Sequence, residues 1–122
     1  MTSSERRIEP RVPVRIHLMY RLMYSPDGAS PEEELHNGNN FLFNVSRGGF
    51  FLSTKNFLEI GSKLQVEFTL ESLGEKVRGA AQVVRANNYN YPIQGHYEYG
   101  LQFETLASGG KEVLDRFVGS TK

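Results

Sequence analysis

Apolar and polar side chains alternate along most of this chain, which is the period of a strand with one buried face. The first alternating stretch covers residues 14–24, with apolar side chains at the even-numbered positions and Arg15, His17 and Arg21 among the others. Shorter stretches of the same kind follow at residues 41–45, 50–53, 63–70, 77–83 and 97–103. The pattern therefore predicts six strands.

The end of the chain has a different period, because Val113, Leu114, Phe117 and Val118 recur at the spacing of one helix face. The glycine pair at 109–110 costs about 1 kcal/mol per residue inside a helix, so the helix is expected to begin after it. The expected fold is all-β with one helix: a small six-stranded antiparallel β-barrel, which leaves no sheet edge exposed, followed by a C-terminal α-helix.

Three segments show neither period. Residues 1–13 are polar and contain two prolines, so we predict a flexible, irregular N-terminal arm ahead of a barrel domain at 14–122. Residues 25–40 are acidic in the middle and rich in turn-forming residues, which predicts a long hairpin insertion. This loop and the tyrosine-rich stretch at 87–99 are the candidate surfaces for contact with a partner.

The composition is that of one folded domain. The chain has 122 residues, 39% of them apolar and 23% charged, which is enough for one core and too little for two. No apolar run approaches the ~20 residues that span a bilayer, so membrane insertion is not expected. The chain has no cysteine, and its first residues lack the apolar segment of a secretory signal. The cytoplasm is therefore the expected location.

The charges are balanced overall but unevenly placed. The net charge is zero, which argues against a protein that neutralises long stretches of nucleic-acid backbone. Residues 5–21 nevertheless carry five arginines against two glutamates, and residues 22–40 carry four acidic residues and no lysine or arginine. This local positive charge suits a small anion.

Two short strings carry the candidate chemistry: Arg7-Ile8-Glu9-Pro10-Arg11 in the arm, and Asn44-Val45-Ser46-Arg47-Gly48-Gly49 between two strands. A guanidinium group binds phosphate oxygens or the O6/N7 edge of guanine through paired hydrogen bonds, and it also stacks on a base. Taken alone, the first string is also typical of a solvated basic tail and the second of a tight turn. Together they indicate a site for a phosphorylated guanine ligand.

The order of these strings on a pattern of six strands and a helix resembles the PilZ domain of bacteria. The resemblance covers almost the whole chain, with residues 44–51 similar to the central motif of the family and residues 81–85 and 99–103 similar to its last two strands. It implies a cytoplasmic receptor for the second messenger cyclic di-GMP, without catalytic activity or a cofactor. Such a receptor would regulate motility, biofilm formation or other surface behaviour through an unidentified protein partner.

The resemblance also implies a role for each motif residue. Arg7 and Arg11 would bind a phosphate and a guanine of the ligand, and the arm would fold over the barrel when the ligand is present. Arg6 precedes the first motif arginine, and in this family an arginine there tends to accompany two stacked ligand molecules. Its guanidinium group would stack on a guanine, a cation–π contact of roughly 0.5–2 kcal/mol. We therefore expect a stacked pair of ligands per chain.

In the second motif, Asn44 and Ser46 would hydrogen-bond the other guanine and a nearby phosphate. Gly49 would leave room for the ligand and permit unusual backbone angles, a role that Gly48 would share.

Two other functions stay open. Some PilZ-like domains act through protein contacts alone and bind no nucleotide, although they usually lack the motif residues that this chain contains. A barrel with exposed aromatic side chains can also bind single-stranded oligonucleotides by stacking, but zero net charge and the lack of a basic stripe disfavour this function. The tyrosines around Pro92 are interpreted as sheet packing, with partner contact as the alternative.

Metal and catalytic sites are not expected. His17, His36 and His96 are far apart and no cysteine accompanies them, so they lack the spacing of metal ligands. Ser46 has no His and Asp in a familiar catalytic arrangement, and residues 32–34 are interpreted as a solvated acidic loop.

Overall fold

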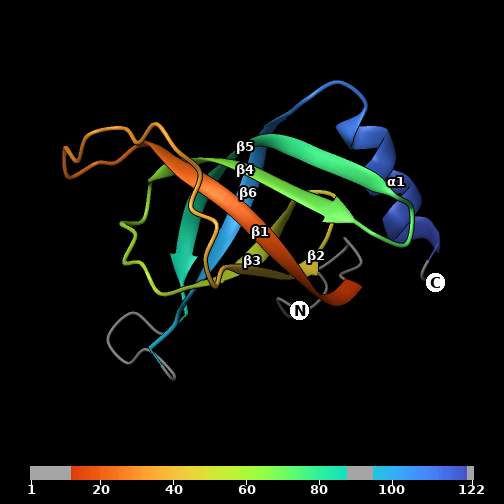
Figure 1. Ribbon diagram of the computed structural model, residues 1–122, viewed down its shortest axis with the longest axis horizontal. Coiled ribbons are helices and arrows are strands. Elements are labelled where there is room, and N and C mark those ends of the chain that lie inside the picture. The colour runs from red at the N-terminus through yellow and green to blue at the C-terminus, as the bar shows by residue number, and fades with distance from the viewer. Residues whose placement is uncertain (1–11, 88–94, 121–122) are drawn as a thin grey trace, which may run out of the picture.

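The computed structural model describes residues 12–87 and 95–120 of the chain. Its strands and helix follow in the order β1 (Val12–Tyr24), β2 (Phe41–Val45), β3 (Gly49–Thr54), β4 (Lys63–Leu70), β5 (Glu75–Ala86), β6 (Tyr97–Leu106) and α1 (Gly110–Ser120). The strands close into an antiparallel barrel in the order β1-β2-β3-β6-β5-β4, with α1 at one end (Figure 1). The predicted fold class is thus confirmed.

The element boundaries differ in detail from the predicted ones. β1 begins at Val12, so two residues assigned to the arm belong to the barrel, and β5 extends beyond both predicted ends. The expectation that the helix begins after both glycines is wrong by one residue. Gly109 has a φ of 85°, but Gly110 is the first helical residue. A Cβ at position 110 would lie 3.2 Å from the Cβ of Leu106, so a glycine lets the helix start close to β6.

β1 closes the barrel because it pairs with two strands in turn. Its first half lies against β2, with His17 opposite Phe41, and its second half lies against β4, from Leu18 opposite Phe68 to Leu22 opposite Leu64. The loop at 25–40 leads into β2 and extends its pairing with β1 beyond the first residue of β2. The amides of His36 and Glu32 donate to the carbonyls of Tyr20 and Leu22 at 2.6 and 2.8 Å. The predicted hairpin insertion is therefore ordered against the barrel wall.

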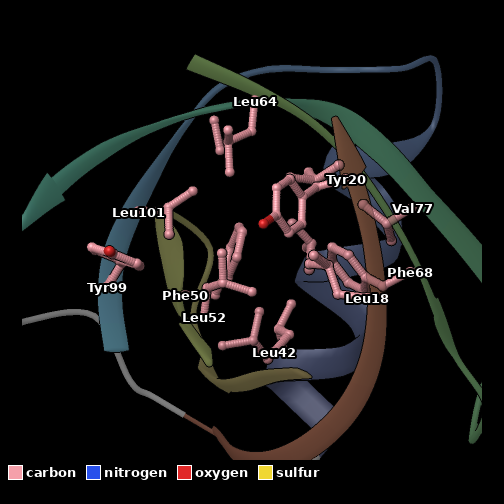
Figure 2. Packing of buried hydrophobic residues seen from close by; sticks show 14 of the residues in the cluster. Leu18, Tyr20, Leu42, Phe50, Leu52, Leu64, Phe68, Val77, Tyr99 and Leu101 are labelled. Carbon is pink, nitrogen blue, oxygen red and sulfur yellow. The ribbon is translucent and has the colours of Figure 1, made fainter. Parts of the chain in front are cut away.

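The barrel interior is filled by alternate side chains from all six strands (Figure 2). Phe50, Phe68 and Phe103 form an aromatic cluster with ring centroids 5.2 to 6.5 Å apart. The buried face of α1 consists of the four residues that the sequence predicted: Val113, Leu114, Phe117 and Val118. At about 25 cal/mol per Å² of apolar surface removed from water, this continuous core is the main source of stability.

A hydrogen-bonded polar network joins the buried residues Tyr20, Thr54 and Asn40 to the exposed Asn56. The hydroxyl groups of Tyr20 and Thr54 lie 3.1 Å apart, Thr54 donates to Asn40 at 2.7 Å, and Asn56 donates to Tyr20 at 2.7 Å. Burial raises the pKa of Tyr20 above its ordinary value, although its hydrogen bonds with Thr54 and Asn56 oppose the shift. The buried hydroxyl groups of Tyr20 and Thr54 thereby have hydrogen-bond partners, as burial requires.

Candidate functional site

The turn between β2 and β3 is organised by one serine. The Ser46 amide donates to the Gly49 carbonyl at 2.8 Å, and the Ser46 hydroxyl accepts from the amides of Gly48 and Gly49 at 3.3 Å each. The serine is only 6% exposed. A short hydroxyl side chain that returns to the following amides is typical of Ser in tight turns. Ser46 thus fixes the main chain of the turn.

Asn44 provides the unusual backbone conformation of the motif. Its φ is 55°, and it is the only non-glycine residue with positive φ in the described ranges. Val12 pairs with Val45 and Arg15 with Phe43, so Pro13 and Val14 together face Asn44 across a β-bulge. Asn tolerates left-handed backbone angles better than most residues. Pro13 has no backbone N–H, so the irregular pairing costs it no ladder hydrogen bond. The motif therefore begins at an irregular point of the barrel wall.

The expectation that Gly48 and Gly49 supply unusual backbone angles is wrong. Neither is among the described glycines with positive φ. Gly49 pairs with Gln102 in the β3–β6 ladder, and a Cβ there would overlap the main-chain oxygen of Leu101. The glycine is required because the β6 backbone approaches closely, and this space is filled by protein.

A pocket of about 340 Å³ adjoins this turn on the outer side of β3, β5 and β6. It is lined by Ser46, Gly48, Gly49, Phe50, Phe51, Val84, Arg85, Gly100, Leu101 and Gln102. Three of the four predicted residues of the second motif, Ser46, Gly48 and Gly49, thus border one pocket.

Arg85 is the cationic residue of this pocket. Its guanidinium carbon lies 5.4 Å from the centroid of the Phe51 ring, which is a cation–π arrangement. A Cβ at Gly100 would lie 3.5 Å from Nε and Nη2 of Arg85 and 3.3 Å from the Phe51 ring. The glycine leaves space in which the guanidinium group lies beside the aromatic ring.

A β-bulge turns Arg85 outward. Val83 pairs with Leu101 and Arg85 with Gly100, so Val84 is an extra residue in β5. Val84 and Arg85 are consequently both exposed, although they are neighbours in a strand. Sequence reasoning gave Arg85 no role. The break in alternation at these two residues was the available signal, but an arginine on a strand is common and the bulge depends on tertiary pairing.

The arginines of the first motif, Arg6, Arg7 and Arg11, lie outside the described residues, so their predicted roles stay predictions. The next two arginines are engaged with the barrel. The guanidinium group of Arg15 lies 4.1 Å from the Phe41 ring centroid, and Arg21 donates to Gln65 and to the Glu32 carbonyl at 2.6 Å each.

The three histidines lie at separate places in the barrel. His17 is 2.9 Å from the Gly38 carbonyl, His36 is 2.9 Å from Glu32, and His96 is 3.1 Å from Ser53. Across residues 12–87 and 95–120, no three His, Asp or Glu side chains gather as metal ligands would. In the same ranges, no helix is long and apolar enough to cross a membrane.

Comparison with known proteins identifies the class of this domain. The PilZ domain model matches residues 5–120, so the chain belongs to the PilZ domain family. A search among curated protein sequences finds no match.

Two solved structures share the fold. One is the inhibitor of motility MotI/DgrA of Bacillus subtilis, with a TM-score of 0.69 and 19% identity over 95% of this chain and 50% of that chain. The other is the PilZ domain of YcgR from Escherichia coli with c-di-GMP, with a TM-score of 0.58 and 17% identity over 94% of this chain and 90% of that chain. The chain thus spans half the length of the Bacillus protein.

Proposed function

We propose that this protein is a receptor for cyclic di-GMP and that the ligand binds in the pocket beside the Ser46–Gly49 turn. The observation that carries the proposal is the convergence of Ser46, Gly48 and Gly49 with the guanidinium group of Arg85 at that pocket. The protein is then a cytoplasmic binding module without catalytic activity.

The chemistry of the pocket suits this ligand. Cyclic di-GMP presents two phosphates and two guanines, so its receptor needs cationic donors and flat surfaces. The guanidinium group of Arg85, beside the Phe51 ring, offers both a charge and a face for stacking. Arg6, Arg7 and Arg11 would supply further donors from the arm, and Asn44 would contribute from the end of β2.

The structural relatives support the proposal. The YcgR PilZ domain was solved with c-di-GMP, and MotI/DgrA is an inhibitor of motility. By analogy, we propose that this chain regulates motility or surface behaviour through a protein partner.

Arm closure is the proposed mechanism. The ligand would connect the arm arginines to the turn and change the surface offered to the partner, and it shifts the arm only by its differential affinity for the two states. We expect hydrogen exchange at residues 5–13 to slow on ligand addition. Unchanged exchange there would contradict closure.

The proposed stoichiometry is a stacked pair of ligands per chain, with Arg6 as the additional cation. Calorimetry should saturate at two ligands per chain. Saturation at one would exclude the pair and leave the receptor function standing.

The receptor function is tested by titrating the protein with cyclic di-GMP, GMP and a short single-stranded oligonucleotide, and repeating the titration with Arg7→Ala and Arg11→Ala. Losing a bidentate arginine contact of about 1–3 kcal/mol should weaken cyclic di-GMP binding roughly five- to a hundredfold or more. The free energy of unfolding should stay nearly constant. If both variants bind like the parent, the arm is not part of the site.

A second candidate function is a protein-interaction module that needs no nucleotide. It is favoured by the turn itself, because Asn44, Ser46 and Gly49 each have a structural reason to be there. Absence of binding to cyclic di-GMP, GMP and the oligonucleotide in the titration would favour this alternative over the receptor.

A further inference from the structure

An ion pair joins the motif turn to the C-terminal helix. Arg47 lies between Ser46 and Gly48, and its Nε donates to Oδ1 of Asp115 in α1 at 2.8 Å. The two side chains are 42% and 44% exposed. The residue next to the pocket-lining serine is therefore in direct contact with α1.

Two ion pairs link α1 to the barrel in the described part of the chain. Besides Arg47–Asp115, Arg116 lies 3.6 Å from Glu75 at the start of β5. Only the first involves the turn at the pocket. The second has no contact with that turn, so it offers a matched control.

We propose that Arg47 is a further ligand-binding residue, whose guanidinium group leaves Asp115 for a phosphate of the bound cyclic di-GMP and so releases α1 from the turn. This inference rests on the proposed receptor function. Ligand binding would then directly remove one contact between the turn and the C-terminal helix.

The transfer of Arg47 from Asp115 to a phosphate favours the ligand. Carboxylate and phosphate compete for the same planar donor fork, and both accept it bidentately. The Arg47–Asp115 pair is exposed on both sides, and such pairs contribute little, so its loss is a small cost. The main chain of the turn stays fixed by Ser46, so only the arginine side chain has to move.

Competition for Arg47 links the affinity for the ligand to the strength of the Arg47–Asp115 ion pair. If the phosphate and Asp115 compete for Arg47, removing the carboxylate must strengthen ligand binding by the same factor by which ligand weakens the pair. We expect Asp115→Asn to bind cyclic di-GMP about two- to fivefold more tightly, the range that an exposed ion pair allows. Arg47→Ala should bind at least fivefold more weakly.

The experiment is calorimetric titration with cyclic di-GMP of the full chain and of Asp115→Asn, Arg47→Ala, the double variant and Glu75→Gln. The double variant should bind like Arg47→Ala, because the carboxylate acts only through the arginine. Glu75→Gln breaks the other α1 ion pair and should bind like the parent. An Asp115→Asn variant that binds like the parent, or more weakly, overturns the inference while the receptor function stands. A parent chain that does not bind overturns both.

Hydrogen exchange gives a second readout at the helix. Ligand should speed exchange at the amides of residues 113–118 in the parent chain and leave it unchanged in Asp115→Asn, where the pair is already absent. Equal effects of ligand on hydrogen exchange in the two proteins would contradict the transfer of Arg47 from Asp115 to the ligand.

Discussion

The main-chain oxygen of Leu101 occupies the space in which a side chain at Gly49 would begin. This relationship gives the most characteristic glycine of the motif a packing role. β3 can approach β6 at this point only because residue 49 has no Cβ, and the pocket wall is built on that approach.

Replacing this glycine should therefore damage the barrel. We expect Gly49→Ala to lower the free energy of unfolding by about 3 kcal/mol, because the methyl group must displace main chain and no flexible side chain can move aside. Chemical denaturation measures the loss. Gly38→Ala is the control, since a Cβ at Gly38 meets nothing within 4 Å and should change stability little. Equal stability of the two variants would contradict the packing role.

The two roles of Asn44, backbone and ligand contact, can be separated by substitution. Asn44→Ala should lower stability by about 1–2 kcal/mol, because alanine is strained at a φ of 55°. Asn44→Gly should lower stability less than Asn44→Ala, because glycine adopts a positive φ without steric strain. If the amide contacts cyclic di-GMP, both variants bind it more weakly in calorimetry. Parent-like binding by Asn44→Gly would leave Asn44 a backbone role alone.

Arg85 is expected to matter for binding and not for folding. Its guanidinium group is exposed over Phe51, so Arg85→Ala should weaken cyclic di-GMP binding about five- to a hundredfold with little change in thermal unfolding. Arg78→Ala removes an exposed arginine from the same strand outside this pocket and should bind like the parent. Similar affinities for the two variants would exclude Arg85 from the site.

Tyr20 should make the barrel sensitive to alkali. Burial raises its pKa, so at pH values below about 10 the phenol is protonated in both folded and unfolded chains. As the pH rises through that value, the unfolded chain loses the proton first, and the free energy of unfolding falls until the pH passes the folded-state pKa.

Tyr20→Phe removes this proton and two hydrogen bonds. At pH 8 the variant should be less stable than the parent by about 1–2 kcal/mol. The difference should shrink between pH 9 and 11, because the parent alone loses the contribution of Tyr20. Denaturation at each pH measures it, and a constant difference would contradict the raised pKa.

Periodicity was sufficient to predict the fold because every strand buries one face in a single core. It failed where tertiary pairing adds a residue. The bulges at Pro13 and at Val84 are set by the strands opposite, and neither the proline nor the break in alternation at Val84 and Arg85 is enough by itself to locate a bulge. The start of β1 and the outward position of Arg85 therefore could not be predicted.

The site shows the same division. Residue types at motif spacing located the turn, and three of its predicted residues border the pocket. Their physical reasons required the structure: the positive φ belongs to Asn44, and Gly49 accommodates Leu101. The ion pair between Arg47 and Asp115 also could not be predicted, because the two residues are far apart in sequence.

The pairing of strands that are far apart in the chain also has a consequence for the order of folding. β2–β3 and β4–β5 are local hairpins, whereas β1–β4 and β3–β6 join segments far apart in the chain, and such contacts form late because long loops must close first. The Ser46–Gly49 turn belongs to a local hairpin, but Arg85 and Gly100 reach it only after β3 has paired with β6. A nucleotide that needs the whole pocket would therefore slow unfolding and leave the folding rate nearly unchanged.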